Sequence, residues 1–248
     1  MNMKNCRNII LAAAVLVAAS SCSDKVQIKG TIAGAPDTQV VVKQLNGGAL
    51  VALDTVKTDG KGAYSYSVEV LKGQPQFIYL YKGDTKVASL LLQKGDKVKV
   101  ASDTLGKYSV EGSAESELLR QVEEDFAAFL DKFTADAARG DNAAASKDYI
   151  DYYRGRVKFI MENAKSLTAI PVLYQKINDN FPVFSQATDA IMFRNVHDSL
   201  MTVYPESRYV SALAREAEKR FNAFDLSQRI QNVQESSYPD LLMVLRFG

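Results

Sequence analysis

One short segment brings together three residue types that can perform covalent catalysis. His197 is followed by Asp198 and Ser199, and serine, histidine and aspartate form the triad of many acyl-transfer enzymes. Consecutive residues of a helix point in different directions, so these side chains cannot converge on one reacting atom. The sequence also has no Gly-x-Ser-x-Gly nucleophile motif. We therefore expect His197 to be a surface or packing residue, and we expect no hydrolase.

Acidic residues raise the question of a metal site. Asp54 and Asp59 flank a tyrosine-containing segment, but Lys57 and Lys61 lie among them and no glutamate closes the segment. A calcium loop needs several oxygen ligands at fixed steps and an acidic residue at its end, so we expect a hairpin turn. One histidine and two cysteines give no zinc-ligand spacing. The sequence predicts no catalytic, metal or cofactor-binding residue.

Two further groups of side chains have both a binding and a structural interpretation. Tyr64, Tyr66, Tyr79 and Tyr81 would suit an aromatic face for a glycan or a peptide. Aromatic residues are also favoured in strands because they pack well, and the chain has no tryptophan, which favours the packing role. Residues 123–125 (EED) are most simply a solvated helix face.

Composition limits the class of protein. The 248 residues are 47% hydrophobic and 24% charged, with a net charge of +1. This is a globular composition. A polybasic nucleic-acid binder is excluded, because neutralising phosphates requires an excess of lysine and arginine.

The N-terminus has the features of a targeting segment. Lys4 and Arg7 precede an apolar run over residues 9–19. As a helix this run would be about 16 Å long, against a hydrocarbon core of about 30 Å, so it is too short for a permanent transmembrane helix. We predict a signal peptide over residues 1–21.

Cys22 directly follows the small residues 18–21 (AASS). This segment resembles the lipobox of bacterial lipoproteins, although Ala19 stands where that family prefers leucine. The resemblance implies cleavage before Cys22, two acyl chains on its sulfur and a third, such as palmitate, on the new amine. The alternative is an ordinary signal peptide with a free Cys22. Several acyl chains anchor stably where one is marginal, so the membrane-lipid contact would be made through Cys22.

The lipoprotein interpretation also predicts a location and a redox state. Ser23 follows the cysteine, and the aspartate rule of the lipoprotein family then implies an outer-membrane anchor in the cell envelope, facing the periplasm or displayed at the surface. Cys6 would leave with the signal peptide and Cys22 would carry lipid. No thiol would remain for a disulfide or a redox pair.

Glycine usage divides the rest of the chain. Eleven of the fourteen glycines fall between Gly30 and Gly112, where they punctuate short segments of alternating polarity. This pattern predicts an antiparallel β-sandwich or open barrel over residues 22–112. The expected strands cover residues 26–32, 40–42, 50–57, 64–70, 76–81, 86–92, 96–101 and 107–110.

From Ser113 onward the apolar spacing becomes helical. An i, i+4, i+8, i+11, i+15 stripe begins at Leu118, and Ser113 is a suitable N-cap. We predict an all-α region over residues 113–237, which makes the fold class α+β. Its expected helices run from 113 to the break at 139–142, around 149–160, from 168 to before 181, around 190–200 and from 206 to 233.

The order of these segments resembles the N-terminal part of thiol:disulfide interchange lipoproteins of Bacteroidota, which begin with a β-domain of unknown function. The matching stretches are residues 26–32 (VQIKGTI), 54–60 (DTVKTDG), 91–96 (LLQKGD), 110–113 (VEGS) and 207–213 (SRYVSAL). In that family a thioredoxin-like domain with a Cys-x-x-Cys pair follows. Residues 238–240 (YPD) resemble its opening, so we interpret residues 238–248 as an apolar tail that is a remnant of its start.

These observations predict a function class but no ligand. Thiolate chemistry needs a cysteine that this chain lacks, so the family's redox activity does not carry over. We expect a non-enzymatic envelope lipoprotein with a binding or scaffolding role and an envelope protein as partner. The alternative is an accessory subunit of a separately encoded thioredoxin-like oxidoreductase.

Overall fold

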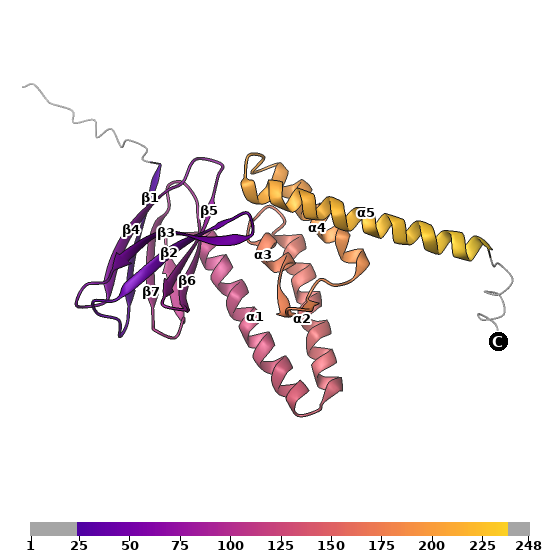
Figure 1. Ribbon diagram of the computed structural model, residues 1–248, viewed down its shortest axis with the longest axis horizontal. Coiled ribbons are helices and arrows are strands. Elements are labelled where there is room, and N and C mark those ends of the chain that lie inside the picture. The colour runs from indigo at the N-terminus through magenta and orange to yellow at the C-terminus, as the bar shows by residue number, and fades with distance from the viewer. Residues whose placement is uncertain (1–23, 238–248) are drawn as a thin grey trace, which may run out of the picture.

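The computed structural model describes residues 24–237, which form an α+β fold (Figure 1). A sandwich of two four-stranded sheets comes first, and a helical region packs against one side of it. The strands of the sandwich are β1 (Lys25–Ile32), β2 (Gln39–Asn46), β3 (Ala49–Lys57), β4 (Ala63–Glu69), β5 (Gln76–Lys82), β6 (Thr85–Leu92), β7 (Lys97–Ser102) and β8 (Tyr108–Glu111). All eight predicted strands are confirmed, as a sandwich without a closed barrel.

The two sheets differ in what covers them. The outer sheet has the order β4-β1-β7-β8, and the inner sheet has the order β3-β2-β5-β6. All neighbouring strands are antiparallel except β1 and β7, which run parallel. Inward-facing side chains of both sheets, among them Ile28, Leu80 and Val98, form one buried core. The outer sheet therefore has one covered face and one solvated face, as its alternating sequence predicts.

The inner sheet is covered on both faces. Ile78, Leu90 and Leu92 point into the sandwich core, whereas Phe77 and Leu91 belong to a second core that they share with the helices. Strand β6 is accordingly buried over six consecutive residues. The inner sheet is thus the middle layer between the outer sheet and the helical region.

The helical region begins immediately after β8. Its helices are α1 (Ala114–Ala138), α2 (Asn142–Glu162), α3 (Ala169–Leu173), α4 (Ala190–Met201) and α5 (Arg208–Ser237), with a short 3-10 helix at Ala187–Asp189. The Ser113 hydroxyl accepts the backbone N–H of Ser116, so Ser113 is the predicted N-cap of α1. The Ser116 hydroxyl in turn accepts the N–H of Leu91 (3.0 Å) and donates to its carbonyl (3.1 Å). The start of α1 is therefore fastened to β6.

The prediction for the third helix is wrong in length. It ends at Leu173 instead of reaching residue 181, and a two-stranded hairpin follows, made of β9 (Lys176–Asn178) and β10 (Phe181–Pro182). The Asn178 side chain accepts the backbone N–H of Asn180, which is a turn that competes with helical hydrogen bonding. The region after residue 112 is therefore predominantly helical and not all-α.

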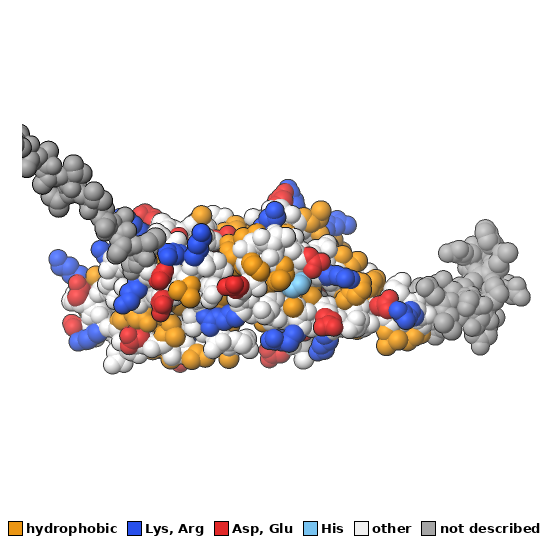
Figure 2. Space-filling view, turned by 90° about the horizontal axis from the view of Figure 1, so that it is seen from above, with side chains coloured by type: hydrophobic (Ala, Val, Ile, Leu, Met, Phe, Trp, Pro, Cys, Tyr) orange, Lys and Arg blue, Asp and Glu red, His pale blue; other side chains and the backbone are white. Residues whose placement is uncertain are grey.

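The last helix projects from the body of the molecule (Figure 1). The first half of α5 packs on α4 through buried residues such as Leu213, while Leu226 and Ile230 are exposed further along. Figure 2 shows hydrophobic side chains beside charged ones on this projecting part. Within residues 24–237 no helix has the length and apolar character needed to cross a bilayer.

Two predictions fall on residues that the structure does not describe. Cys22 and the signal peptide lie before residue 24, and the apolar tail over residues 238–248 lies after residue 237. Both lie outside the described residues and stay predictions.

Candidate functional site

The chain is fixed to the sandwich from residue 24 onward. The Asp24 carbonyl accepts the backbone N–H of Val70 (2.6 Å), and its carboxylate pairs with the Lys94 ammonium (2.5 Å). Two residues of extended chain span at most about 7 Å. Any group attached to Cys22 would therefore be held close to the end of the sandwich at which β1 begins.

The solvated face of the outer sheet carries several lysines on its two central strands. Lys29 of β1 and Lys99 of β7 are register partners, and Gln27 is opposite Lys97 in the same strand pair. All four residues are exposed. Like charges on neighbouring strands repel each other, so this arrangement contributes nothing favourable to folding.

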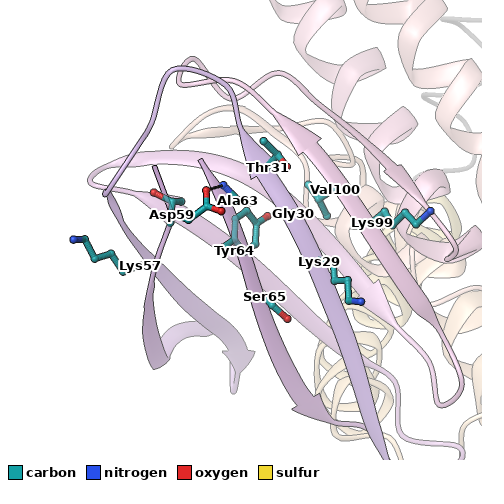
Figure 3. A pocket seen from close by; sticks show the side chains of 11 residues that line it. Lys29, Gly30, Thr31, Lys57, Asp59, Ala63, Tyr64, Ser65, Lys99 and Val100 are labelled. Carbon is teal, nitrogen blue, oxygen red and sulfur yellow. Dashed lines mark hydrogen bonds between the residues drawn. The ribbon is translucent and has the colours of Figure 1, made fainter. Parts of the chain in front are cut away.

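A shallow hollow of about 730 Å³ lies beside these lysines (Figure 3). Lys29, Lys57 and Lys99 line it from three strands, together with Thr31, Ser65 and Asp59 (Figure 3). Lys57 pairs with Asp37 (3.0 Å) and the Asp59 carboxylate is bonded within its turn, so the cations left for a ligand are Lys29 and Lys99. Cationic and hydroxyl donors at the rim of a hollow suit an anion such as a phosphate group.

Gly30 and Tyr64 also line the hollow, and their contact is close. A Cβ atom added at Gly30 would lie 2.1 Å from the Tyr64 ring, which is 94% buried and cannot swing away. The Tyr64 hydroxyl is buried without a hydrogen-bond partner among the described residues, and burial raises the pKa of this phenol. The ring covers the glycine in the way that aromatic side chains protect strand glycines.

This contact leads to a prediction about stability. We expect Gly30→Ala to lower the free energy of unfolding by about 1–3 kcal/mol, because the added methyl group overpacks a buried site. Gly155→Ala is the matched control: it lies inside α2 with nothing within 4 Å of the added Cβ, and it should be neutral or stabilising. Urea unfolding of both variants makes the comparison, and equal stability of the two would contradict the packing argument.

Asp59 adopts the predicted hairpin turn. Its carboxylate accepts the backbone N–H groups of Lys61 (2.8 Å) and Ala63 (2.9 Å). These hydrogen bonds, that of Ala63 first, hold the pKa of Asp59 below its usual value. Its carboxylate is thus used by the turn, and among the described residues no three histidine, cysteine or acidic side chains are placed to share a metal ion.

The four strand tyrosines do not form one aromatic face. Tyr64 and Tyr66 of β4 pack into the sandwich core, whereas Tyr79 of β5 packs against the core shared with the helices. Tyr81 stacks under the ammonium of Lys43 at 4.1 Å. The structure therefore separates them over two sheets and does not assemble an aromatic platform from them.

His197 lines a groove between α4 and α5. Its Nδ1 lies 2.9 Å from a carboxylate oxygen of Asp198, and Phe221 lies in the same groove. Ser199 lines other hollows, next to Met161. The structure therefore keeps Ser199 apart from His197. This agrees with the prediction that consecutive helical residues point in different directions.

Glu123 is a polar residue whose role the sequence interpretation missed. Its carboxylate accepts hydrogen bonds from Lys86 (2.7 Å) and Ser89 (2.8 Å) of β6 and from the Tyr108 hydroxyl (3.3 Å). The expected solvated face is wrong for Glu123, since this network joins α1 to both sheets. Ser89 in the middle of an apolar strand was the available signal, because a buried hydroxyl needs a partner.

The comparisons with known proteins fit this architecture. Residues 26–119 match a protein-family model described as a domain of unknown function, DUF4369. The match spans all eight strands of the sandwich and the first turns of α1, including the Ser116 that is bonded to β6. No curated protein matches the chain.

Proposed function

We propose that this chain is a membrane-anchored envelope lipoprotein with a non-catalytic binding or scaffolding role. The observation that supports it most is the position of Cys22, directly after the small residues 18–21 and two residues before the chain is bonded to the sandwich. An acylated Cys22 would hold the folded part close to the lipid surface.

Metabolic labelling of the expressed full-length chain with palmitate tests the anchor. Label on the chain, together with recovery in the membrane fraction, is the expected result. An unlabelled chain recovered in the aqueous phase would contradict the proposal.

The proposal of a non-catalytic role leads to a prediction about redox activity. Residues 23–248 contain no cysteine, and a thiolate is the nucleophile of thiol–disulfide exchange. We expect the purified chain from residue 22 onward, with Cys22→Ser, to show no insulin reduction and no thiol oxidation above the rate without protein. Disulfide exchange by this variant would overturn the non-enzyme proposal, since no thiol would remain to explain it.

The second candidate is an accessory subunit of a separately encoded thioredoxin-like oxidoreductase. It is favoured by the order of segments, which resembles the non-catalytic part of thiol:disulfide interchange lipoproteins, and by the projecting α5 with its exposed Leu226 and Ile230. Chemical cross-linking in envelope preparations tests it: a cross-linked protein with a Cys-x-x-Cys pair favours the subunit role. Cross-links only to proteins without such a pair favour the scaffolding role.

A further inference from the structure

Three of the lysines on the solvated face of the outer sheet have no side-chain partner among the described residues, and Lys25 is not one of them. The ammonium groups of Lys29, Lys97 and Lys99 make no hydrogen bond or ion pair within residues 24–237, whereas some lysines elsewhere, such as Lys86, are paired with carboxylates. Lys25 lies on the same face, at the beginning of β1. A charged group that is left without a counter-ion by its own fold is available to an external anion.

Acidic residues on this face do not neutralise it. Glu69 is the register partner of Lys25, and Glu111 is the register partner of Lys99. They stand on the outermost strands β4 and β8, while the lysines stand on the central strands β1 and β7. The centre of the face is therefore positive, with four lysines against two glutamates.

We propose that this basic face lies against an anionic lipid surface, with phosphate headgroups seated around Lys29 and Lys99. The proposal rests on the proposed anchoring through Cys22, which would restrict the face to the vicinity of the bilayer. Thr31 and Ser65 at the hollow add short hydroxyl donors beside the two ammonium groups. Lysine on a flexible stem binds a phosphate group as a point charge.

The position of the anchor is compatible with this orientation. Lys25 is three residues from Cys22, and β1 carries Lys25 and Lys29 along the same face of the sheet. Hydroxyl, amide and ammonium side chains occupy that face together with the two carboxylates, and large apolar residues are absent from its exposed positions on β1, β4, β7 and β8. The contact would therefore be with headgroups and would not insert into the hydrocarbon.

Vesicle sedimentation of the non-acylated chain tests this orientation. The protein used is the chain from residue 22 onward with Cys22→Ser, and the vesicles are phosphatidylcholine alone or phosphatidylcholine mixed with phosphatidylglycerol. We expect binding to the anionic vesicles only, and loss of binding at high salt, because about 1 M salt screens charges beyond about 3 Å. Lys29→Gln combined with Lys99→Gln should weaken binding about 25-fold, since each lysine near an anionic surface contributes about fivefold.

The control variant removes two positive charges from the helical region instead of from the basic face. Lys176 and Lys219 are exposed in the helical region, and replacing both with glutamine should leave vesicle binding unchanged. Equal loss in the two double variants would overturn the proposal, since it would reflect net charge and not this face. Binding of neutral vesicles to the same extent, or competition by free inorganic phosphate at equal phosphate concentration, would also overturn it. Because the tested chain carries no lipid, these outcomes are separate from palmitate labelling of Cys22.

Discussion

Replacing Cys22 with serine is expected to abolish palmitate labelling and to move the protein from the detergent phase to the aqueous phase. Lipoprotein acylation needs the thiol sulfur, and serine offers no thiolate to accept the lipid. The apolar run over residues 9–19 cannot substitute as an anchor, because it is too short to span the bilayer. Detergent phase partitioning of cells that express each variant is the measurement.

The chain provides its own control for this experiment. Cys6 lies before the apolar run, and Cys6→Ser should leave both labelling and membrane recovery intact. A Cys22→Ser protein that still requires detergent for extraction would refute the lipid anchor. Membrane binding through the lysine-bearing face would be salt-sensitive, whereas attachment through acyl chains would not. A high-salt wash therefore separates electrostatic binding from the lipid anchor.

The strands of the sandwich could be predicted because their determinants are local. Alternation such as that of Tyr64, Tyr66 and Val68 requires only neighbouring residues, and turn glycines mark the ends. Gly47 and Gly48 both have positive φ in the β2–β3 hairpin, which is the conformation that two-residue hairpin loops favour. The same local logic identified the N-cap Ser113.

What surrounds a strand is a non-local property, and here the sequence interpretation was incomplete. The apolar run at residues 90–92 interrupts the alternation, as is typical of strands covered on both faces. This run indicates a strand that is covered on both faces, but not which segments of the chain cover it. Likewise, the prediction of the third helix is correct for the apolar segment up to Leu173. Beyond it the chain forms a hairpin whose turn is held by Asn178, so the helix does not continue.

The candidate site could not be predicted for the same reason. Lys29 and Lys99 are separated by 69 intervening residues, and only the parallel pairing of β1 with β7 makes them neighbours. The sequence shows each lysine merely as the polar member of an alternating strand. Pairing of distant strands depends on the whole sandwich, whereas Cys22 was recognisable because its signal lies within a few adjacent residues.

The second large effect is expected at the contact between the inner sheet and the helices. Phe77 of β5 is 1% exposed, and its ring meets that of Tyr209 edge to face at 4.9 Å. The Phe77 backbone N–H donates to the Tyr209 hydroxyl (3.1 Å), which itself donates to the carbonyl of Leu45 (3.2 Å). The beginning of α5 is thus bonded to two strands of the inner sheet.

We expect Phe77→Ala to lower the free energy of unfolding by about 3–5 kcal/mol, because it leaves a cavity in the core shared by the sheet and the helices. Typical domains are stable by only about 5–15 kcal/mol, so the variant should be severely destabilised. Guanidinium unfolding, followed by circular dichroism at a helix-sensitive wavelength and by tyrosine fluorescence, measures the change.

A control variant and the shape of the unfolding transition show whether the Phe77–Tyr209 contact couples the sandwich to the helices. Leu53 of β3 is 41% exposed, and Leu53→Ala should cost no more than about 0.5 kcal/mol. If the shared core couples sandwich and helices, both probes of the wild-type chain should report one coincident transition that Phe77→Ala shifts as a whole. Separate transitions, with only one of them shifted, would show instead that the sandwich is stable by itself and that the helices cover a sheet face which does not depend on them.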